Sequence, residues 1–208
     1  MEIAGVYLAA GKSSRMGRNK LTLPIGTKFL GSMALETAIH ASFTKIYCIV
    51  TESDDLNWMT PSQLEHPKCV ILRCPDAHKG QSESLRCGIL QAKRDEMSAA
   101  LILLADMPFV TVQMLEEMIA CMKEQNDCSF VATSIKEMIT PPVLVSNTLF
   151  DELLTIHGDI GARRLLEKRI QSGKLIPCKD ERFVFDIDTP EDYDHFKVNS
   201  CQGSDSNV

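Results

Sequence analysis

The sequence predicts an α/β fold with a mainly parallel sheet, and three observations lead to this expectation. Short apolar segments alternate along the chain with segments of helical periodicity. The chain has 208 residues, which is enough to bury a core without disulfides or structural metals as supports. Its composition, 44% hydrophobic and 24% charged, is that of a globular protein. We therefore expect a single domain over residues 1–198.

The first part of the chain predicts four buried strands separated by helices. Apolar runs of strand length lie at residues 3–8, 45–50, 70–73 and 101–105. Helices are expected at residues 32–42, 82–93 and 112–123. The last helix carries an apolar stripe that is expected to fill the core, formed by Met114, Leu115, Met118, Ile119 and Met122. This alternation of strands and helices favours parallel strand pairs.

The last third of the chain is less regular. Short strands are expected at residues 129–134, 142–145, 174–177 and 182–185. A helix is expected at residues 159–169, with Asp159 as its N-cap. A final helix is expected after Thr189, because a threonine followed by Pro190 and acidic residues is typical of helix starts. Residues 199–208 are small and polar, so we expect a disordered tail there.

Composition also excludes several classes of protein. Lys and Arg number 22 against 28 Asp and Glu, and the net charge of −6 argues against a nucleic-acid partner. The longest apolar run, at residues 99–105, is far shorter than the roughly 20 residues that cross a membrane. The apolar N-terminal segment lacks the basic residues of a secretory signal, so we expect a cytoplasmic protein without a membrane partner. The eight cysteines form no C-x-x-C pair and are expected to be reduced thiols.

The distribution of charge gives the first indication of a functional site. Residues 3–35 contain no acidic residue but five basic ones, and four of these lie shortly after the first strand, namely Lys12, Arg15, Arg18 and Lys20. A loop of small and basic residues at the carboxyl end of a parallel strand offers backbone N–H groups and cations to a polyphosphate. A solvated basic loop is the alternative, and the small residues beside the cations favour the polyphosphate site.

Three better-known motifs do not fit the chain. Gly5 and Gly11 are separated by one residue more than a P-loop allows. The spacing of Gly11 and Gly17 excludes the dinucleotide-binding G-x-G-x-x-G pattern. Gly80-Gln81-Ser82-Glu83-Ser84 resembles a nucleophile elbow but lacks its second glycine, so serine hydrolysis has little support.

Aspartates give the second indication. Asp106 comes directly after the strand expected at residues 101–105, so it is expected at the same edge of the sheet as the basic loop. A carboxylate beside bound phosphates is best explained by Mg²⁺, which prefers oxygen ligands, and the alternative is an aspartate that starts the turn before Pro108. Asp186 and Asp188 lie two residues apart and would share one face of a strand. Asp188 is the expected second metal ligand, with a capping or turn role as the alternative.

With these residues in place, the sequence resembles the MobA-like nucleoside triphosphate transferases, and within them the molybdenum cofactor cytidylyltransferase branch that includes the PucB-type purine catabolism proteins. The likeness extends from Gly5 to about Phe196, and residues 8–20 meet the whole signature Leu-Ala-Ala-Gly-x-Ser-x-Arg-Met-Gly-x-x-Lys. Many relatives carry Gly-x-Pro where this chain has Thr140-Pro141-Pro142. The other matching segments are Gly80 with Ser84, Asp106-Met107-Pro108, Gly158-Asp159-Ile160-Gly161-Ala162-Arg163 and Asp186-Ile187-Asp188-Thr189-Pro190.

The resemblance implies a Rossmann-like three-layer α/β/α nucleotidyltransferase fold with a mostly parallel mixed sheet. It implies a nucleotide-binding half at residues 1–110 and an acceptor-side half at residues 111–198. The implied reaction transfers CMP from CTP to the phosphate of molybdopterin and releases pyrophosphate, with a molybdenum hydroxylase such as xanthine dehydrogenase as the possible client. CTP rather than GTP is implied because guanylyl-transferring relatives tend to carry glycine where this chain has Ala10.

The resemblance also implies roles for individual residues. Arg15, Lys20 and Asp106 are expected to be catalytic, with Arg15 at the leaving phosphates and Lys20 at the α-phosphate. Asp106 and Asp188 are expected to bind Mg²⁺. The expected nucleotide-binding residues are Leu8, Ala9, Ala10, Gly11, Lys12, Ser13, Ser14, Arg15, Lys20, Gly80, Ser84 and Asp106, and those on the acceptor side are Asp159, Gly161 and Arg163.

Two other functions stay open at this stage. One is nucleotidyl transfer to another phosphorylated acceptor, such as a sugar phosphate or a polyol phosphate. The other is a non-catalytic chaperone that inserts the molybdenum cofactor into an enzyme. The presence of Arg15, Lys20, Asp106 and Asp188 together favours an enzyme, since a pure binding protein would not need the metal carboxylates.

Overall fold

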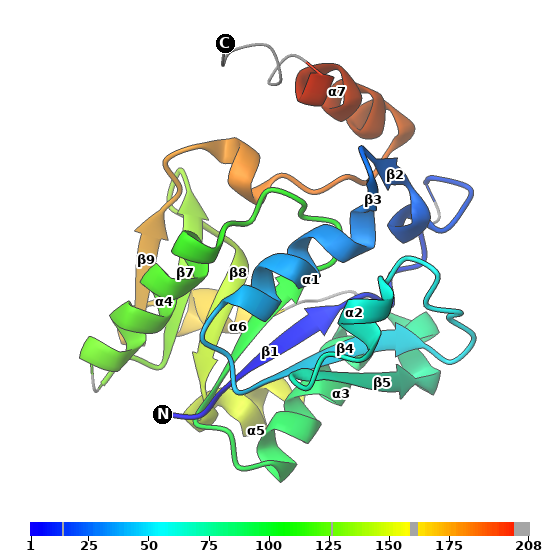
Figure 1. Ribbon diagram of the computed structural model, residues 1–208. Helices are drawn as coiled ribbons and strands as arrows, with labels where there is room; N and C mark the ends of the chain where they lie inside the picture. The colour runs from blue at the N-terminus through cyan, green and yellow to red at the C-terminus, as the bar shows by residue number, and fades with distance from the viewer. Residues whose placement is uncertain (14, 126, 159–161, 202–208) are drawn as a thin grey trace.

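One sheet of seven strands forms the centre of the molecule, in the order β5-β4-β1-β6-β8-β7-β9 (Figure 1). The structure is a computed structural model, and it describes residues 1–201 except 14, 126 and 159–161, leaving aside the side chains of 196–201. The strands are β1 (Ile3–Leu8), β4 (Lys45–Thr51), β5 (Cys69–Cys74), β6 (Ala99–Leu104), β7 (Phe130–Ile135), β8 (Met138–Ser146) and β9 (Gly173–Pro177). Neighbouring strands are parallel except at β8, which runs antiparallel to both β6 and β7. The predicted mostly parallel mixed sheet is therefore confirmed.

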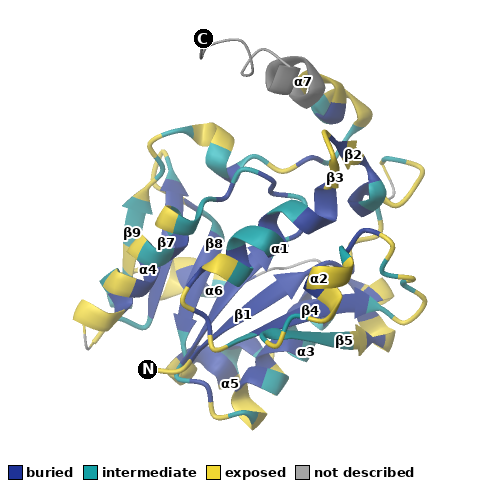
Figure 2. Ribbon diagram, in the orientation of Figure 1, coloured by how far each residue is buried: buried dark blue, intermediate teal, exposed yellow. Residues whose placement is uncertain are grey.

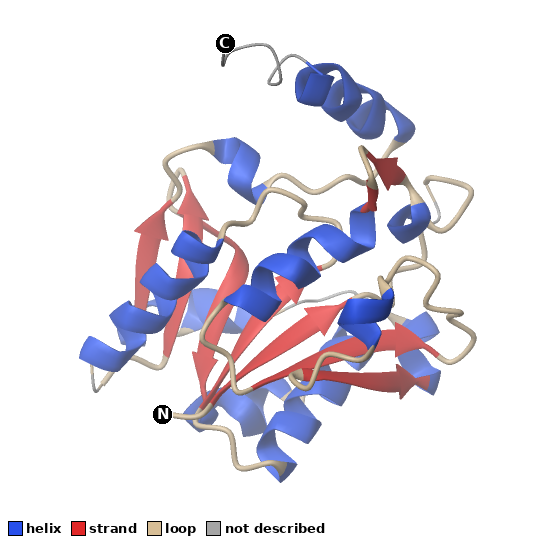
Figure 3. Cartoon of the chain, viewed as in Figure 1, coloured by secondary structure: helices blue, strands red, loops and turns tan. Residues whose placement is uncertain are grey.

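Helices cover both faces of the sheet, so the fold has three layers (Figure 3). On one face lie α1 (Leu30–His40) and α4 (Val112–Glu124), and on the other lie α3 (Gln81–Arg94), α5 (Phe150–Leu153) and α6 (Arg163–Lys168). Each face has its own apolar cluster, and the strands between the two clusters are largely buried (Figure 2). The remaining elements are α2 (Pro61–Leu64), α7 (Pro190–Cys201) and a hairpin of β2 (Pro24–Ile25) and β3 (Lys28–Phe29).

Most elements predicted from the sequence are present, with ends that differ by a few residues. The apolar stripe of α4 is buried as its spacing predicts, with Leu115, Met118, Ile119 and Met122 in the core and Met114 packed against it. The predicted start of α7 is also confirmed. Thr189 Oγ1 accepts a hydrogen bond from the Asp192 N–H at 3.1 Å, and Asp192 Oδ2 accepts one from the Thr189 N–H at 2.8 Å.

The strand predicted at residues 182–185 is wrong. The segment Glu181–Val184 is a 3₁₀ helix. The Asp180 carboxylate accepts hydrogen bonds from the backbone N–H and the Nε–H of Arg182, each at 3.0 Å, and this turns the chain. Such a local bond from a side chain to the backbone competes with strand pairing. The sequence favoured a strand here because the residues after Arg182 are apolar.

Two further expectations fall partly or wholly outside the described residues. Helix α6 begins at Arg163 with Ala162 as its N-cap, so the helix start expected at residue 159 is wrong, and Asp159 itself lies outside the described residues. Helix α7 extends to Cys201 and so enters the segment for which we expected a disordered tail, while residues 202–208 are not described. Among the described residues, no helix is long and apolar enough to cross a membrane. The seven cysteines whose side chains are described are free thiols.

A segment near the C-terminus packs on the hairpin region of residues 23–30 at the carboxyl edge of the sheet. A third apolar cluster joins Ile187 and Tyr193, near the C-terminus, to Leu23, Ile25 and Leu30. Tyr193 donates its hydroxyl to the carbonyl oxygen of Pro24 at 2.6 Å. The Ile187 N–H donates to the carbonyl oxygen of Asp106 at 3.0 Å. These contacts hold the segment that carries Asp188 beside the end of β6.

Candidate active site

The basic loop after β1 folds so that its lysine returns to the edge of the sheet. The backbone is left-handed at Ser13 (φ 48°) and at Gly17 (φ 66°), which reverses the chain. Ser13 Oγ accepts a hydrogen bond from the Lys20 N–H at 3.1 Å. Asn19 caps the short 3₁₀ helix Lys20–Thr22 by accepting from the Leu21 N–H at 3.0 Å. The backbone of Lys20 is therefore held from both sides.

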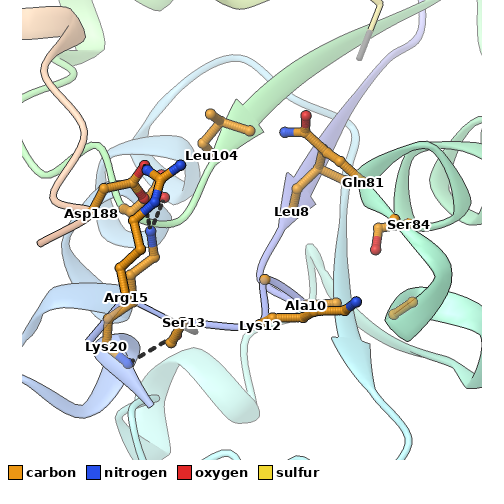
Figure 4. A pocket seen from close by; sticks show the side chains of 14 residues that line it. Leu8, Ala10, Lys12, Ser13, Arg15, Lys20, Gln81, Ser84, Leu104 and Asp188 are labelled. Atoms are coloured by element: carbon orange, nitrogen blue, oxygen red, sulfur yellow. Dashed lines mark hydrogen bonds and ion pairs between the residues drawn. The ribbon is translucent and has the colours of Figure 1, made fainter. Parts of the chain in front are cut away.

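A cavity of about 500 Å³ opens at the carboxyl ends of β1 and β6, between the basic loop and the start of α3 (Figure 4). Its lining residues are Leu8, Ala10, Gly11, Lys12, Ser13, Arg15, Lys20, Ala77, Gly80, Gln81, Ser84, Leu104, Asp106 and Asp188. All but three of these are residues that the sequence singled out for the site. The basic loop and the aspartates, far apart in the chain, thus share one cavity.

The three lining residues that sequence reasoning missed are Ala77, Gln81 and Leu104. Gln81 is the first residue of α3 and lies directly after Gly80, so a helix starting there would have pointed to it. Leu104 is the last residue of β6, two residues before Asp106, so the end of this strand could have pointed to it. Ala77 lies in a 3₁₀ helix, Pro75–Lys79, for which the sequence carried no recognised signal.

Two of the expected residues, Ala9 and Arg163, are described and do not line the cavity, and three more lie outside the described residues. The side chain of Ala9 is buried in the apolar cluster on the opposite face of the sheet, since successive residues point to opposite sides. Arg163 pairs with Glu167 inside α6, with an Nε to Oε1 distance of 2.8 Å. The others, Ser14, Asp159 and Gly161, lie outside the described residues.

The segment that the resemblance assigns to the acceptor nevertheless starts beside the cavity. The Ser82 N–H, in the first turn of α3, donates to the carbonyl oxygen of Gly158 at 3.2 Å. Gly158 has a φ of 75°, which glycine adopts without strain. This contact attaches the beginning of the acceptor-side segment to the helix that carries Gln81 and Ser84.

Lys20 lies between two of the carboxylates. Its Nζ donates to Asp106 Oδ2 at 2.5 Å and to Asp188 Oδ1 at 2.6 Å, while Arg15 donates to Asp188 Oδ2 at 2.9 Å (Figure 4). Lys20 is only 7% exposed, whereas the Arg15 side chain is 69% exposed. Burial alone would lower the pKa of Lys20, but the charges and hydrogen bonds of Asp106 and Asp188 outweigh it and raise that pKa. Lys20 is therefore a firmly charged ammonium in the wall of the cavity.

Three carboxylates form a candidate metal site. One oxygen each of Asp106, Asp186 and Asp188 lies within 4.8 Å of the others. Asp106 Oδ1 is buried and has no hydrogen-bond partner among the described residues, which is costly unless a cation or donor satisfies it. Loss of solvent around its carboxyl raises the pKa of Asp186, and the charges of Asp106 and Asp188 raise it further, although the residue as a whole is exposed. Crowded oxygen donors of this kind fit a hard divalent cation such as Mg²⁺.

The geometry that brings Asp186 and Asp188 together differs from the one expected. Residues 185–188 form no strand, so the two carboxylates do not share a face by strand alternation. They meet because the irregular segment is held by two bonds directly after Asp186. The Ile187 N–H donates to the carbonyl oxygen of Asp106 at 3.0 Å, and the Asp188 N–H donates to Asp192 Oδ2 at 3.1 Å.

The opposite side of the cavity is formed by the start of α3. In Figure 4, Lys12 extends toward this side, whereas Arg15 and Lys20 turn toward Asp188. Gly80 precedes α3 with a φ of 142°, which favours glycine, and no side-chain hydrogen bond caps the helix among the described residues. The start of this 14-residue helix therefore borders the cavity, with its Ser82 and Glu83 N–H groups already donating to the carbonyl oxygens of Gly158 and Gly80 at 3.2 Å each.

A family model and one known protein match most of the chain. The family model described as the MobA-like NTP transferase domain matches residues 5–173. The purine catabolism protein PucB of Bacillus subtilis (strain 168) is 37% identical over 197 residues, which cover 92% of this chain and 94% of that protein.

Two solved structures from mycobacteria share the fold. The homologue of Mycobacterium tuberculosis Rv0371c from Mycobacterium sp. strain JC1 superimposes with a TM-score of 0.80 at 24% identity, covering 97% of this chain and 98% of that one. The complex of M. tuberculosis H37Rv Rv0371c with manganese has a TM-score of 0.71 at 22% identity, and the match covers 95% of this chain and 99% of that one. At these identities the likeness shows a common fold.

Proposed function

The chain belongs to the MobA-like NTP transferase family and is a nucleotidyltransferase, and on this premise we propose that it transfers CMP from CTP to the phosphate of molybdopterin. The observation that carries the proposal is one cavity with Lys12, Arg15 and Lys20 on its basic loop and Asp106 and Asp188 beside them. The relative from B. subtilis is named for purine catabolism. We therefore propose a molybdenum hydroxylase such as xanthine dehydrogenase as the enzyme that receives the product.

The proposed reaction is a direct displacement at phosphorus. An oxygen of the acceptor phosphate attacks the α-phosphorus of CTP and forms the new P–O bond. The bond between the α-phosphorus and the oxygen of the β-phosphate breaks, and pyrophosphate leaves with the electron pair. No bond to the protein is formed, so the chain contributes positioning and neutralisation of charge.

The basic loop would hold the triphosphate. Backbone N–H groups of Gly11, Lys12, Ser13 and Ser14 are proposed to bind the phosphate oxygens. Arg15, whose side chain is largely exposed at the mouth of the cavity, is proposed to neutralise the leaving β- and γ-phosphates. Lys20 is proposed to move onto the α-phosphate, where negative charge accumulates in the transition state.

Asp106 and Asp188 would hold a divalent cation, which we propose to be Mg²⁺, with Asp186 as a third carboxylate within reach. Such an ion, when bound, neutralises phosphate oxygens and so favours both attack and departure of pyrophosphate. The buried Oδ1 of Asp106 would gain the partner that it lacks among the described residues. The manganese complex of Rv0371c shows that a relative of the same fold binds such an ion.

The acceptor is proposed to bind on the side formed by residues 111–198, with residues 1–110 forming the nucleotide side. Asp159, Gly161 and Arg163 are the proposed acceptor residues. Support comes from the hydrogen bond between Ser82 and Gly158, which brings the start of their segment to α3 beside the cavity.

CTP is proposed as the donor because the residue on the floor of the cavity is alanine and not glycine, which leaves less room for a purine base. Ala10 lines the cavity, and its methyl group is proposed to narrow the space beside the base. One methyl group supplies only about 1–3 kcal/mol of discrimination, so polar groups must contribute the rest. Ser84 and the backbone near Gly80, which line the same cavity, are proposed to read the amino and carbonyl edge of cytosine, where an unpaired buried polar group would penalise the wrong base.

A competition assay tests the donor. Equal concentrations of CTP and GTP are offered to the wild type and to Ala10→Gly, and both dinucleotide products are quantified. We expect the wild type to prefer CTP and Ala10→Gly to shift toward GTP by roughly tenfold, the effect of about 1.4 kcal/mol. Faster use of GTP by the wild type would refute the cytidylyl assignment. An unchanged ratio in Ala10→Gly would leave that assignment in place and remove Ala10 as its cause.

A panel of acceptors tests the other substrate. Molybdopterin, a sugar phosphate and a polyol phosphate are each incubated with CTP and Mg²⁺, and the products are identified by mass spectrometry. We expect a cytosine dinucleotide only from molybdopterin. A product from the sugar or polyol phosphate would redefine the acceptor, and the absence of any product with bound cofactor retained would indicate a chaperone.

A further inference from the structure

Lys20 occupies two oxygens of the candidate metal site and leaves Asp106 Oδ1 without a partner among the described residues. Its Nζ is bonded to one oxygen of Asp106 and one of Asp188, at 2.5 and 2.6 Å, and the second oxygen of Asp188 is bonded to Arg15. A divalent cation at about 2.1 Å from the same two oxygens would lie less than about 5 Å from the ammonium. The two positive charges would repel each other there, and water screens the repulsion little because the side chains of Lys20 and Asp106 are only 9% and 16% exposed.

The side chain of Lys20 can leave this position without a change of fold. Its backbone N–H is held by Ser13, and Asn19 caps the turn that follows, so the Cα is fixed. The four-carbon stem beyond it is flexible, and the ammonium lies in the wall of the cavity of about 500 Å³. A triphosphate in that cavity would offer Lys20 another anion within reach of a rotation of its side chain.

We propose that Lys20 is an internal counter-cation that competes with the metal ion for Asp106 and Asp188, so that triphosphate binding makes the metal site available by drawing the lysine away. This inference rests on the proposed function, since it needs a triphosphate in the cavity. Because coupling between two ligands is reciprocal, metal and nucleotide each strengthen the binding of the other. The nucleotide-free protein then binds the metal ion weakly. The metal ion occupies Asp106 and Asp188, and Lys20 contacts the phosphates, only when the triphosphate is present.

The test is a titration with Mn²⁺ in the absence of nucleotide, in which free Mn²⁺ is measured by electron paramagnetic resonance. Wild type, Lys20→Met and Lys12→Met are compared. Lys12 is the matched control, because it lies in the same loop and cavity but forms no ion pair with the described residues. We expect Lys20→Met to bind Mn²⁺ at least tenfold more tightly than the wild type, and Lys12→Met to bind within about threefold of it.

Equal or weaker binding by Lys20→Met would overturn the proposal, and so would an equal gain in Lys12→Met, which would mean a general effect of charge.

A second measurement uses only the wild type, in case the variants do not fold. Labelling of lysine amines, read by mass spectrometry, should increase at Lys20 but not at Lys12 when saturating Mg²⁺ replaces EDTA. Unchanged labelling of Lys20 would also overturn the proposal. Neither measurement contains nucleotide or acceptor. The competition proposal can therefore fail while transfer activity is intact, and transfer to molybdopterin can be absent while the competition is confirmed.

Discussion

At the scale of single residues, the two oxygens of Asp106 have different surroundings. Oδ2 accepts a hydrogen bond from Lys20, and Oδ1 is buried without a partner among the described residues. Asp106→Asn keeps the shape of the side chain but removes its charge, so we expect turnover to be lost while the fold is kept. The measurement is kcat over a Mg²⁺ titration, with a thermal melt as the control for folding. A near-wild-type rate at limiting Mg²⁺ would show that Asp106 is not a metal ligand.

The proposed role of Lys20 in the transition state predicts a particular kinetic pattern. A cation at the α-phosphate gains most when charge accumulates there, so Lys20→Ala should lower kcat more than it raises the KM for the nucleotide. The expected loss is about 3 kcal/mol, roughly a hundredfold in kcat. Lys12→Ala is the comparison, and its loss should appear mainly in KM. If Lys20→Ala changed KM alone, the lysine would act only in binding the substrate.

The sequence was sufficient to identify these residues but not their pairing. Asp106 was recognised because it follows an apolar strand, and Lys20 because it belongs to a basic loop without acidic neighbours. The contacts of Lys20 with Asp106 and Asp188 span 86 and 168 residues of chain. Such distances along the chain are bridged only by the fold, and neither the composition nor the spacing of the sequence encodes them locally.

At the scale of elements, α3 lies close to the sheet at a glycine. A Cβ added to Gly88 would lie 2.4 Å from Cγ1 of Val6 in β1, closer than atoms can approach. Alanine in an exposed helix is more stable than glycine by about 1 kcal/mol, but here we expect Gly88→Ala to destabilise the protein by about 1–3 kcal/mol. Urea unfolding measures the change. Leu90→Ala is the control, because Leu90 lies in the same helix and is 39% exposed, and it should reduce the free energy of unfolding much less. A Gly88→Ala protein more stable than the wild type would contradict the close packing.

The other end of α3 predicts a dependence of stability on pH. Asp95 Oδ2 accepts hydrogen bonds from Lys45 at 2.6 Å and Tyr47 at 2.7 Å, and Oδ1 accepts one from Gln91 at 2.8 Å. The bond from Lys45, followed by that from Tyr47, lowers the pKa of Asp95 below its ordinary value of 3.8. Stability from such a carboxylate is present above the unfolded-state pKa and is lost as the pH falls through the lowered pKa.

We therefore expect Asp95→Asn to reduce the free energy of unfolding at pH 7, and the difference from the wild type to shrink as the pH falls below 3.8. Chemical unfolding at a series of pH values measures it. A difference that stays constant down to acidic pH would show that the charge of Asp95 is not what holds this end of α3.

Elements with strong periodicity were predictable, and those set by local hydrogen bonds were not. The stripe of α4 and the apolar run of β6 follow from burial on one or both faces, which leaves a clear pattern in the sequence. The 3₁₀ helix Glu181–Val184 depends instead on the side chain of Asp180, which bonds to the backbone that follows it. Its apolar residues resemble those of a strand, so pattern alone favoured the wrong element.

At the scale of the whole molecule, the order of the strands explains the place of the cavity. From β1 the chain adds β4 and β5 on one side and then crosses to add β6 on the other. Open α/β sheets form a crevice where the strand order reverses in this way, at the carboxyl ends of the strands. The cavity lies at the ends of β1 and β6, which is this point. The sequence predicted the edge of the sheet, but the strand order that creates the crevice required the structure.

The packing of the chain's C-terminal part onto its N-terminal part completes the site. Asp188 reaches the cavity because Ile187 and Tyr193 pack on the hairpin that follows the basic loop. The sequence predicts Asp188 as a metal ligand at the end of a strand shared with Asp186, but residues 185–188 form no strand. Its position comes from long-range packing and from the hydrogen bond between Ile187 and Asp106.

The central claim, transfer of CMP from CTP to molybdopterin at this cavity, is tested most directly by the release of pyrophosphate. The full-length protein is incubated with Mg²⁺ and molybdopterin, and CTP, GTP, ATP and UTP are supplied one at a time. The account predicts pyrophosphate release with CTP that depends on both molybdopterin and Mg²⁺, and much slower release with the other three nucleotides. Release that is fastest with GTP, or no release with any nucleotide in the presence of molybdopterin, would contradict it.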